Sequence, residues 1–283
     1  MRLCSYRTHN TTEAGILLQD KIIPISQINS EQRTHFPIRL QSLIENLSEF
    51  KSLTSLSQKL TSASGFPIDT VRFSPPYLSP PKIWGIGLNY RDHASDLGAQ
   101  LPTEPASFMK PRTSIIGHED SVLLPRESER VTAEAELGVI IGKPCKNVTE
   151  EAADDYIFGY VPIIDMTAED ILQKNPRFLT RAKSFDTFFS FGPSVITRDE
   201  IEDLSDLTVS TVLNGNVVRS NQVRNMTFSP KHLIAFHSHG MTLEPGDIIS
   251  TGTPGAGVIR RGDVVESKIT NFPTLKNYVK DAD

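Results

Sequence analysis

Cysteine is scarce in this chain, because only Cys4 and Cys145 occur among its 283 residues. Neither lies near a second cysteine or in a spacing typical of metal ligands, which argues against a disulfide framework and against a cysteine-ligated metal. Cysteines of this kind are usually reduced and buried in proteins of reducing compartments. We therefore expect two core thiols in a cytoplasmic protein.

Long apolar runs are also absent, and no stretch approaches the length of a membrane-spanning helix. The first twenty residues lack the apolar core of a secretory signal. A net charge of −5 and a pI of about 5.8 argue against nucleic acid and membranes as partners. With 38% hydrophobic and 22% charged residues, the composition is that of a globular protein with a sizeable core.

The first 75 residues are predicted to form a small domain of strands and helices. Residues 2–7 and 14–25 have the composition of short strands, and apolar residues recur at helical spacing between 30 and 64. Four prolines between positions 75 and 81 then favour an extended connection. We place the domain boundary there, which gives an N-terminal domain of residues 1–75 and a second domain of residues 76–283.

The second domain is predicted to be rich in strands. Asn214-Gly215 between two β-rich runs indicates a hairpin turn. Ser229 as N-cap, Pro230 as first residue and Gly240 past the end delimit one helix. Few long helices interrupt the strands, so the pattern predicts an α+β fold that is mainly β, a mixed and mainly antiparallel roll. Strands are expected at residues 82–88, 137–142, 161–165, 194–197, 207–220, 246–254 and 263–269.

Glu134 and Glu136 stand two apart where an apolar strand begins. Alternate residues of a strand share a face, so both carboxylates project the same way. Burying two like charges without a partner is costly. Either the strand reaches the surface here and both glutamates are solvated, or the pair belongs to a metal site.

Several other stretches carry side chains that could act in catalysis or binding, and each also has an ordinary structural explanation. Asp165 ends an apolar strand, where it could also cap a helix. Lys183 lies among apolar and small residues, although most lysines are at the surface. On a helix, His93 and Asp96 would share a face, as a general base and its orienting acid or as a surface pair. Thr253 lies in a glycine-rich segment that could bind a carboxylate or form a tight turn.

Taken together, the motifs resemble the fumarylacetoacetate hydrolase (FAH) family. The stretches "IWGIGLNYRDHA", "PASFMKP", "AEAELGVIIGK", "FGYVPIIDMTAED", "AKSFDTFFSFGP", "VLNGNVV" and "LEPGDIISTGTPGAGV" occur in the order seen in that family. The resemblance extends from about residue 81 to residue 279. The N-terminal segment is similar to the small domain of bacterial-type members.

The resemblance implies an FAH-type mixed β-sandwich roll, a homodimer, and one Mg²⁺ or Mn²⁺ in each subunit. Hard oxygen ligands suit these ions. The residues that match the family motifs are Glu134, Glu136 and Asp165 as metal ligands, Lys183 beside the developing enolate, His93 and Asp96 as a water-activating dyad, and Thr253 and Lys110 as substrate-binding residues.

The implied function is cleavage of a C–C bond in a 2-oxo acid through a metal-stabilised enolate, as in acylpyruvate hydrolysis. The same site would serve oxaloacetate decarboxylation or isomerisation of a 2-oxo or enol acid. The alternative from a different functional class is a family member without catalytic activity that only binds a metabolite.

Some positions depart from the family pattern. Ile164 and Glu169 replace an asparagine and an arginine near the third ligand, and Leu88 replaces an arginine of acylpyruvase-type members. Arg219, which stands where glutamine is frequent, is either a compensating cation or a surface residue. His237 and His239 are two apart at a helix end, where they point to different faces, so we expect neither to bind metal.

Overall fold

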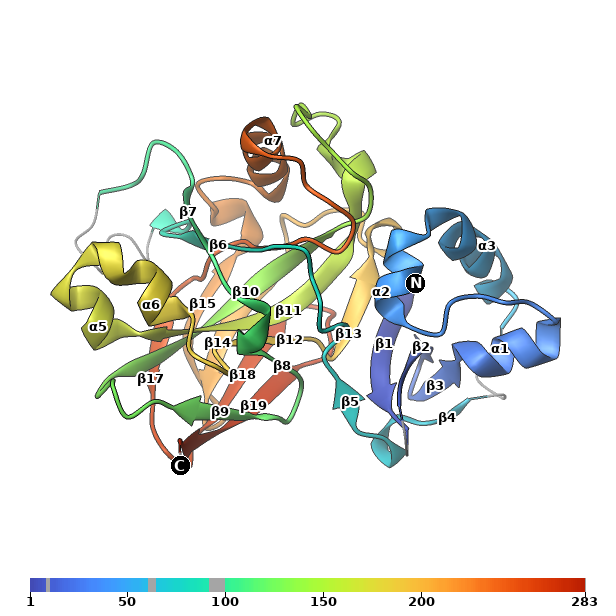
Figure 1. Ribbon diagram of the computed structural model, residues 1–283, viewed down its shortest axis with the longest axis horizontal. Coiled ribbons are helices and arrows are strands. Elements are labelled where there is room, and N and C mark those ends of the chain that lie inside the picture. The colour runs from blue at the N-terminus through green and yellow to red at the C-terminus, as the bar shows by residue number, and fades with distance from the viewer. Residues whose placement is uncertain (9–10, 61–64, 92–99, 283) are drawn as a thin grey trace.

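The protein is built around two β-sheets, and the helices lie at their margins (Figure 1). The computed structural model describes residues 1–8, 11–60, 65–91 and 100–282. Among these residues, none of the helices has both the length and the apolar character needed to cross a membrane. The predicted class, α+β and mainly β, is confirmed.

The larger sheet has fourteen strands. Along its main path these are β4 (Phe66–Pro67), β3 (Lys21–Pro24), β2 (Thr12–Leu18), β1 (Arg2–Arg7), β13 (Ser194–Thr197), β11 (Ile157–Ala168), β10 (Val131–Ile141), β16 (Ile248–Ser250), β6 (Ile83–Gly87) and β7 (Ala106–Met109). Four short strands pair beside this path: β5 (Phe73–Ser74), β8 (Ile115–Ile116), β12 (Phe189–Phe191) and β17 (Ala256–Ile259).

The smaller sheet has five strands, in the order β15 (Asn216–Gln222), β14 (Thr208–Leu213), β18 (Val264–Ile269), β19 (Leu275–Asp281) and β9 (Ser121–Leu124). The predicted hairpin joins β14 to β15. Asn214 and Gly215 have φ values of 51° and 81°, the left-handed conformation that a tight two-residue hairpin turn requires. This local prediction is confirmed.

In the described part of the chain, the α-helices are α1 (Ile25–Gln32), α2 (Leu40–Glu45), α3 (Leu47–Ser57), α5 (Glu169–Lys174), α6 (Leu179–Lys183) and α7 (Pro230–Gly240). The helical stretch predicted for residues 30–64 is divided, because Pro37 stands between α1 and α2, where it cannot donate a helical hydrogen bond. At the start of α7, the Ser229 side chain accepts a hydrogen bond from the His232 amide, as predicted. Gly240 is the last helical residue instead of the residue past the end, because the chain turns extended at Met241.

The N-terminal elements, blue in Figure 1, continue the larger sheet. Strand β1 pairs antiparallel with β13, with Leu3 opposite Val195. Leu3 and Leu43 from the first 75 residues also share one buried cluster with Phe158 and Phe191. A domain boundary near residue 75 stays a prediction. The larger sheet and one buried apolar cluster both contain residues from the two sides of this position.

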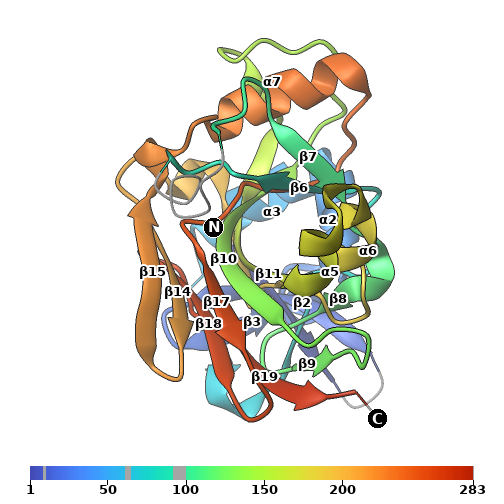
Figure 2. The ribbon, with the colours of Figure 1, turned by 90° about the vertical axis from the view of Figure 1, so that its left-hand side faces the viewer.

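Strands β10 and β11 form the long antiparallel centre of the larger sheet (Figure 2). Every residue of β11 is buried, and so is every residue of β10 except the half-buried Glu134. Apolar side chains on one face, such as Ala133, Leu137 and Ile164, fill the core. Strand alternation therefore directs the polar residues of both strands to the opposite face.

Candidate active site

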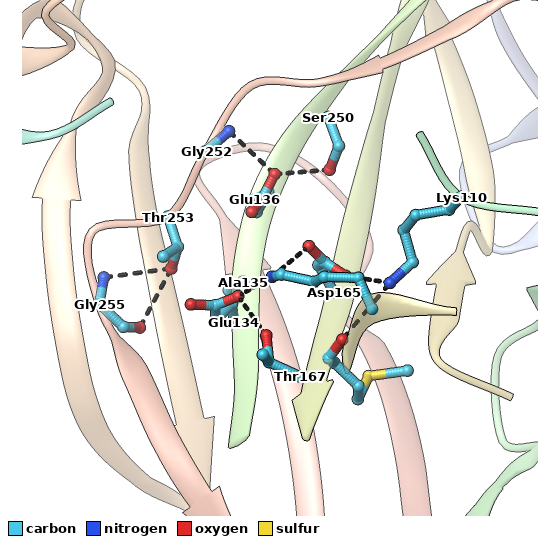
Figure 3. A network of polar contacts seen from close by, with 12 residues as sticks. Lys110, Glu134, Ala135, Glu136, Asp165, Thr167, Ser250, Gly252, Thr253 and Gly255 are labelled. Carbon is cyan, nitrogen blue, oxygen red and sulfur yellow. Dashed lines mark hydrogen bonds and ion pairs between the residues drawn. The ribbon is translucent and has the colours of Figure 1, made fainter. Parts of the chain in front are cut away.

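Three carboxylates converge on the polar face of β10 and β11 (Figure 3). Glu134 lies directly opposite Asp165 in the strand register, and Glu136 follows two residues along β10. One carboxylate oxygen from each of the three lies within 4.8 Å of the others. The two glutamates are therefore not a solvated strand end, because Glu136 and Asp165 are buried and Glu134 is half-buried.

Glu136 is held by hydrogen bonds to a single oxygen. Its Oε2 accepts from the Ser250 hydroxyl at 2.5 Å and from the Gly252 amide at 2.9 Å (Figure 3). Burial, reinforced by the negative charges of Asp165 and Glu134, raises the pKa of Glu136 to about 8. Without a cation, this carboxyl group is therefore mostly protonated at neutral pH.

Asp165 is held by two ammonium groups. The Lys110 Nζ donates to its Oδ1 at 2.5 Å, and the Lys183 Nζ donates to its Oδ2 at 2.7 Å. Burial opposes ionisation of Asp165, but the two cations outweigh it and hold the pKa of this carboxyl below its ordinary value. Asp165 does not cap a helix, because α5 begins at Glu169 with Ala168 as its N-cap.

Lys183 ends helix α6 and is buried, so it is not a surface lysine. Its Nζ also donates to Glu134 Oε2 at 2.6 Å and lies 5.0 Å from the centre of the Phe108 ring. Burial disfavours the charged form, yet the nearby carboxylates of Asp165, Glu134 and Glu136 raise the pKa of Lys183 above its ordinary value. This group therefore stays an ammonium ion throughout the physiological range.

The pKa of Lys110 is shifted in the opposite direction from that of Lys183, although both lysines contact Asp165. Burial lowers the pKa of Lys110 to about 8, with a further contribution from the positive charge of Lys183, and Asp165 only partly opposes this. The direct contact between Lys110 and a candidate metal ligand was missed by sequence reasoning. The signal was present in "SFMK", because a spacing of two in an extended chain directs Phe108 and Lys110 to one face.

The donor set fits a hard dication. Three carboxylates offer oxygen ligands, the kind that Mg²⁺ and Mn²⁺ prefer. Within the described part of the chain, Oε1 of Glu134 and Oε1 of Glu136 receive no hydrogen bond, whereas each Oε2 is engaged. One oxygen of each glutamate is thus fixed by the protein and the other is left for a ligand.

The side chain of Thr253 forms hydrogen bonds within its own turn (Figure 3). Its hydroxyl donates to the Gly255 carbonyl and accepts from the Gly255 amide, both at 3.1 Å. Thr211 joins this turn to β10, because its hydroxyl donates to the Gly255 carbonyl and accepts from the Ala135 amide. The tight-turn interpretation is therefore correct, and substrate binding by Thr253 stays a prediction.

Two predicted site residues, His93 and Asp96, lie outside the described residues. Their role as a dyad stays a prediction from the sequence. His237, in contrast, is described and buried: its Nε2 lies 2.6 Å from the Ser107 hydroxyl and its Nδ1 lies 2.6 Å from the Leu233 carbonyl. His239 is exposed, so the two histidines do face different ways.

Two departures from the family pattern, Ile164 and Glu169, have structural explanations. Ile164 is fully buried on the face of β11 opposite Asp165, so its side chain belongs to the core. Glu169 pairs with Arg130, whose Nε lies 2.5 Å from Glu169 Oε2, so the negative charge introduced there is balanced. Arg219 is exposed, but its side chain carbons lie against Gly255, where an added Cβ would come within 2.6 Å of them.

Known proteins resemble this chain over most of its length. The family described as fumarylacetoacetate (FAA) hydrolase C-terminal matches residues 82–280. An uncharacterized protein of Archaeoglobus fulgidus is 47% identical over 212 residues, which cover 75% of this chain and 83% of that protein. Oxaloacetate tautomerase fahd2, mitochondrial, of Xenopus laevis is 34% identical and covers 99% of this chain and 90% of its own length.

Among solved structures, a maleylpyruvate hydrolase from Sphingobium sp. SYK-6, in complex with manganese (II) ion and pyruvate, superimposes with a TM-score of 0.82. Its sequence is 29% identical, and the match covers 100% of both chains.

Proposed function

The chain belongs to the fumarylacetoacetate hydrolase family of hydrolases and isomerases, and on this basis we propose that it is a divalent-metal-dependent enzyme acting on a 2-oxo acid through an enolate. The observation that carries the proposal is the convergence of Glu134, Glu136 and Asp165 with the Lys183 ammonium among them. We assign the three carboxylates as ligands of one Mg²⁺ or Mn²⁺ ion. The manganese complex of the similar hydrolase supports this assignment.

A bound dication would supply a Lewis acid that stabilises the negative charge of an enolate, an effect worth several kcal/mol. The protein adds fixed donors around it. Lys183 is kept protonated by its carboxylate neighbours and can donate to an oxygen that becomes negative. Lys110 holds Asp165 in place and contributes a second positive charge for a substrate carboxylate. Thr253 is assigned to the same carboxylate.

Among reactions that share this enolate, we favour keto–enol tautomerisation of a 2-oxo dicarboxylic acid such as oxaloacetate. The relative named for that activity aligns with almost the whole chain. Tautomerisation needs stabilisation of the enolate and proton transfer, but no attacking water. The described residues thus supply its main electrostatic requirement.

Hydrolysis of an acylpyruvate is the second candidate. The structural likeness to a maleylpyruvate hydrolase supports it, as does the sequence match of His93 and Asp96 to a water-activating dyad. Decarboxylation of oxaloacetate would use the same enolate. The acidic cluster and Lys183 are all present, which argues against a silent metabolite-binding protein.

One experiment separates these reactions. Purified protein is mixed with enol-oxaloacetate or an acylpyruvate in the presence of Mg²⁺, Mn²⁺ or EDTA. Loss of the enol absorbance reports tautomerisation, and lactate dehydrogenase reports released pyruvate. We expect metal-dependent loss of enol without release of pyruvate from oxaloacetate. Pyruvate release from the acylpyruvate would favour hydrolysis, and metabolite binding without any turnover would overturn the proposal of an enzyme.

The homodimer and the cytoplasmic location stay predictions. Sedimentation velocity of the purified protein tests the first, because a dimer has twice the 31.4 kDa mass of the chain.

A further inference from the structure

Asn89 is a fully buried residue that joins two remote segments of the chain. Its Nδ2 donates to the Thr251 carbonyl at 2.7 Å and to the Phe228 carbonyl at 3.0 Å. Its Oδ1 accepts from the Phe228 amide at 2.8 Å. Both amide hydrogens and the carbonyl oxygen of this side chain are therefore in use, so its orientation is fixed.

The bond to Thr251 leads directly to the acidic cluster. The Thr251 carbonyl and the Gly252 amide belong to one planar peptide group. That amide donates to Glu136 Oε2 at 2.9 Å, so the peptide is held at its carbonyl end by Asn89 and at its amide end by Glu136. A hydrogen bond to a carbonyl also polarises its peptide, which makes the N–H a stronger donor.

The backbone conformation at Gly252 brings this peptide against Asn89. Gly252 has φ of +94°, a conformation that side chains disfavour, and a Cβ there would lie 2.7 Å from the Asn89 Cβ and 3.0 Å from the Ile86 carbonyl oxygen. Only glycine allows so close an approach. The contact between Asn89 and the peptide therefore requires this residue at this position.

We propose that Asn89 is a positioning residue for Glu136, acting through the Thr251–Gly252 peptide. With Ser250, this peptide fixes Oε2 of Glu136 and directs Oε1 toward the candidate dication. Asn89 thereby sets the affinity for the metal without touching it. This inference rests on the proposed metal site and adds to it a residue beyond the ligands, of the kind that commonly changes metal affinity 10- to 100-fold.

The test measures Mn²⁺ binding by titration calorimetry or electron paramagnetic resonance. Asn89→Ala removes all three side chain hydrogen bonds, and Asn89→Asp keeps the shape but cannot donate to Thr251. Asn277, in β19 of the smaller sheet, offers a matched control because it is also fully buried. Its Nδ2 donates to two backbone carbonyls, that of Gly117 at 2.7 Å and that of Asp120 at 3.0 Å. Asn277→Ala and Asn277→Asp complete the set.

All four variants are expected to lower the melting temperature, because each loses buried hydrogen bonds. Only the Asn89 variants are expected to raise the Mn²⁺ dissociation constant, by about tenfold or more. Equal changes in Mn²⁺ affinity for both pairs, or no change at Asn89, would overturn the role of Asn89. Failure of the unaltered protein to bind Mn²⁺ would instead overturn the metal site itself.

A measurement on the unaltered protein covers the case in which Asn89 variants do not fold. Hydrogen exchange of the Gly252 amide in the metal-free protein is expected to be slow, because Asn89 and Glu136 hold both ends of the peptide. Rapid exchange would contradict the proposal.

Discussion

Lys110 and Lys183 donate hydrogen bonds to opposite oxygens of the Asp165 carboxylate, at 2.5 and 2.7 Å. Both lysines and Asp165 are buried. The charged groups of this site therefore depend on one another, because each would be unstable in the interior alone. Changing one of them is expected to alter metal binding, stability and catalysis to different extents.

Glu136→Gln is expected to abolish Mn²⁺ binding and metal-dependent turnover together, because an amide cannot provide the negative charge of a metal ligand. Calorimetric titration and the enol-oxaloacetate assay measure the two effects. Glu266→Gln in the smaller sheet, where Glu266 pairs with Lys268, is the control and should leave both unchanged. Full activity of Glu136→Gln with saturating metal would rule out the proposed ligand.

The same substitution is expected to change how the stability of the metal-free protein depends on pH. The pKa of Glu136 is raised from 4.5 to about 8, so between these values the folded state holds a proton that the unfolded state has released. This group's contribution to stability therefore falls as pH rises through that window. Glu136→Gln removes this loss of unfolding free energy, which is on the order of 3 kcal/mol between pH 4.5 and 7. Urea unfolding at several pH values, without metal, checks the difference from the unaltered protein.

Lys183→Met is expected to destabilise the metal-free protein by about 3–5 kcal/mol, since it leaves buried carboxylates with one ammonium fewer. Mn²⁺ should restore much of the melting temperature by replacing the lost positive charge. Turnover should still fall roughly a hundredfold or more, because the fixed donor is gone. If metal restored activity as well as stability, Lys183 would have only a structural role.

Gly252→Ala and Gly262→Ala form a matched pair. Both glycines have positive φ, +94° and +89°, but an added Cβ meets Asn89 only at Gly252 and has no atom within 4 Å at Gly262. Gly262→Ala is expected to cost about 1 kcal/mol of unfolding free energy, from backbone strain alone. Gly252→Ala should cost more and should also weaken Mn²⁺ binding. Equal costs with unchanged metal affinity would show that the contact at Gly252 has no consequence.

Much of the fold is encoded locally, and these features were predictable from the sequence. The hairpin around Asn214 and Gly215 depends on two residues that accept positive φ, and the start of α7 depends on Ser229 and Pro230. The strand that carries Glu134 and Glu136 was predicted from its alternation and apolar continuation. The family resemblance then supplied the third carboxylate, Asp165, which no spacing argument could have placed opposite Glu134.

The remaining features depend on contacts between distant segments. No local pattern indicates that β1 pairs with β13 to continue the larger sheet, or that Lys110 reaches Asp165, because these partners are separated by 55 residues or more. No sequence pattern indicated the role of Asn89 either, because only the completed fold brings its partners Thr251 and Phe228 to it. The end of α7 was misplaced by one residue, because Gly240 is still helical and the chain becomes extended only at Met241.

The charges described at the site have a consequence for the order of events. Before a cation binds, Glu136 is mostly protonated, and the carboxylates of Glu134 and Asp165 balance the ammonium groups of Lys110 and Lys183. One dication, which would displace the proton of Glu136, raises the sum of these charges from zero to +1. An anionic 2-oxo acid is therefore attracted by the loaded centre but not by the empty one, so we expect the cation to bind first. Equilibrium dialysis with a 2-oxo acid in EDTA tests this, and tight retention there would contradict it. Supply of the ion, as much as of the acid, then decides when turnover begins.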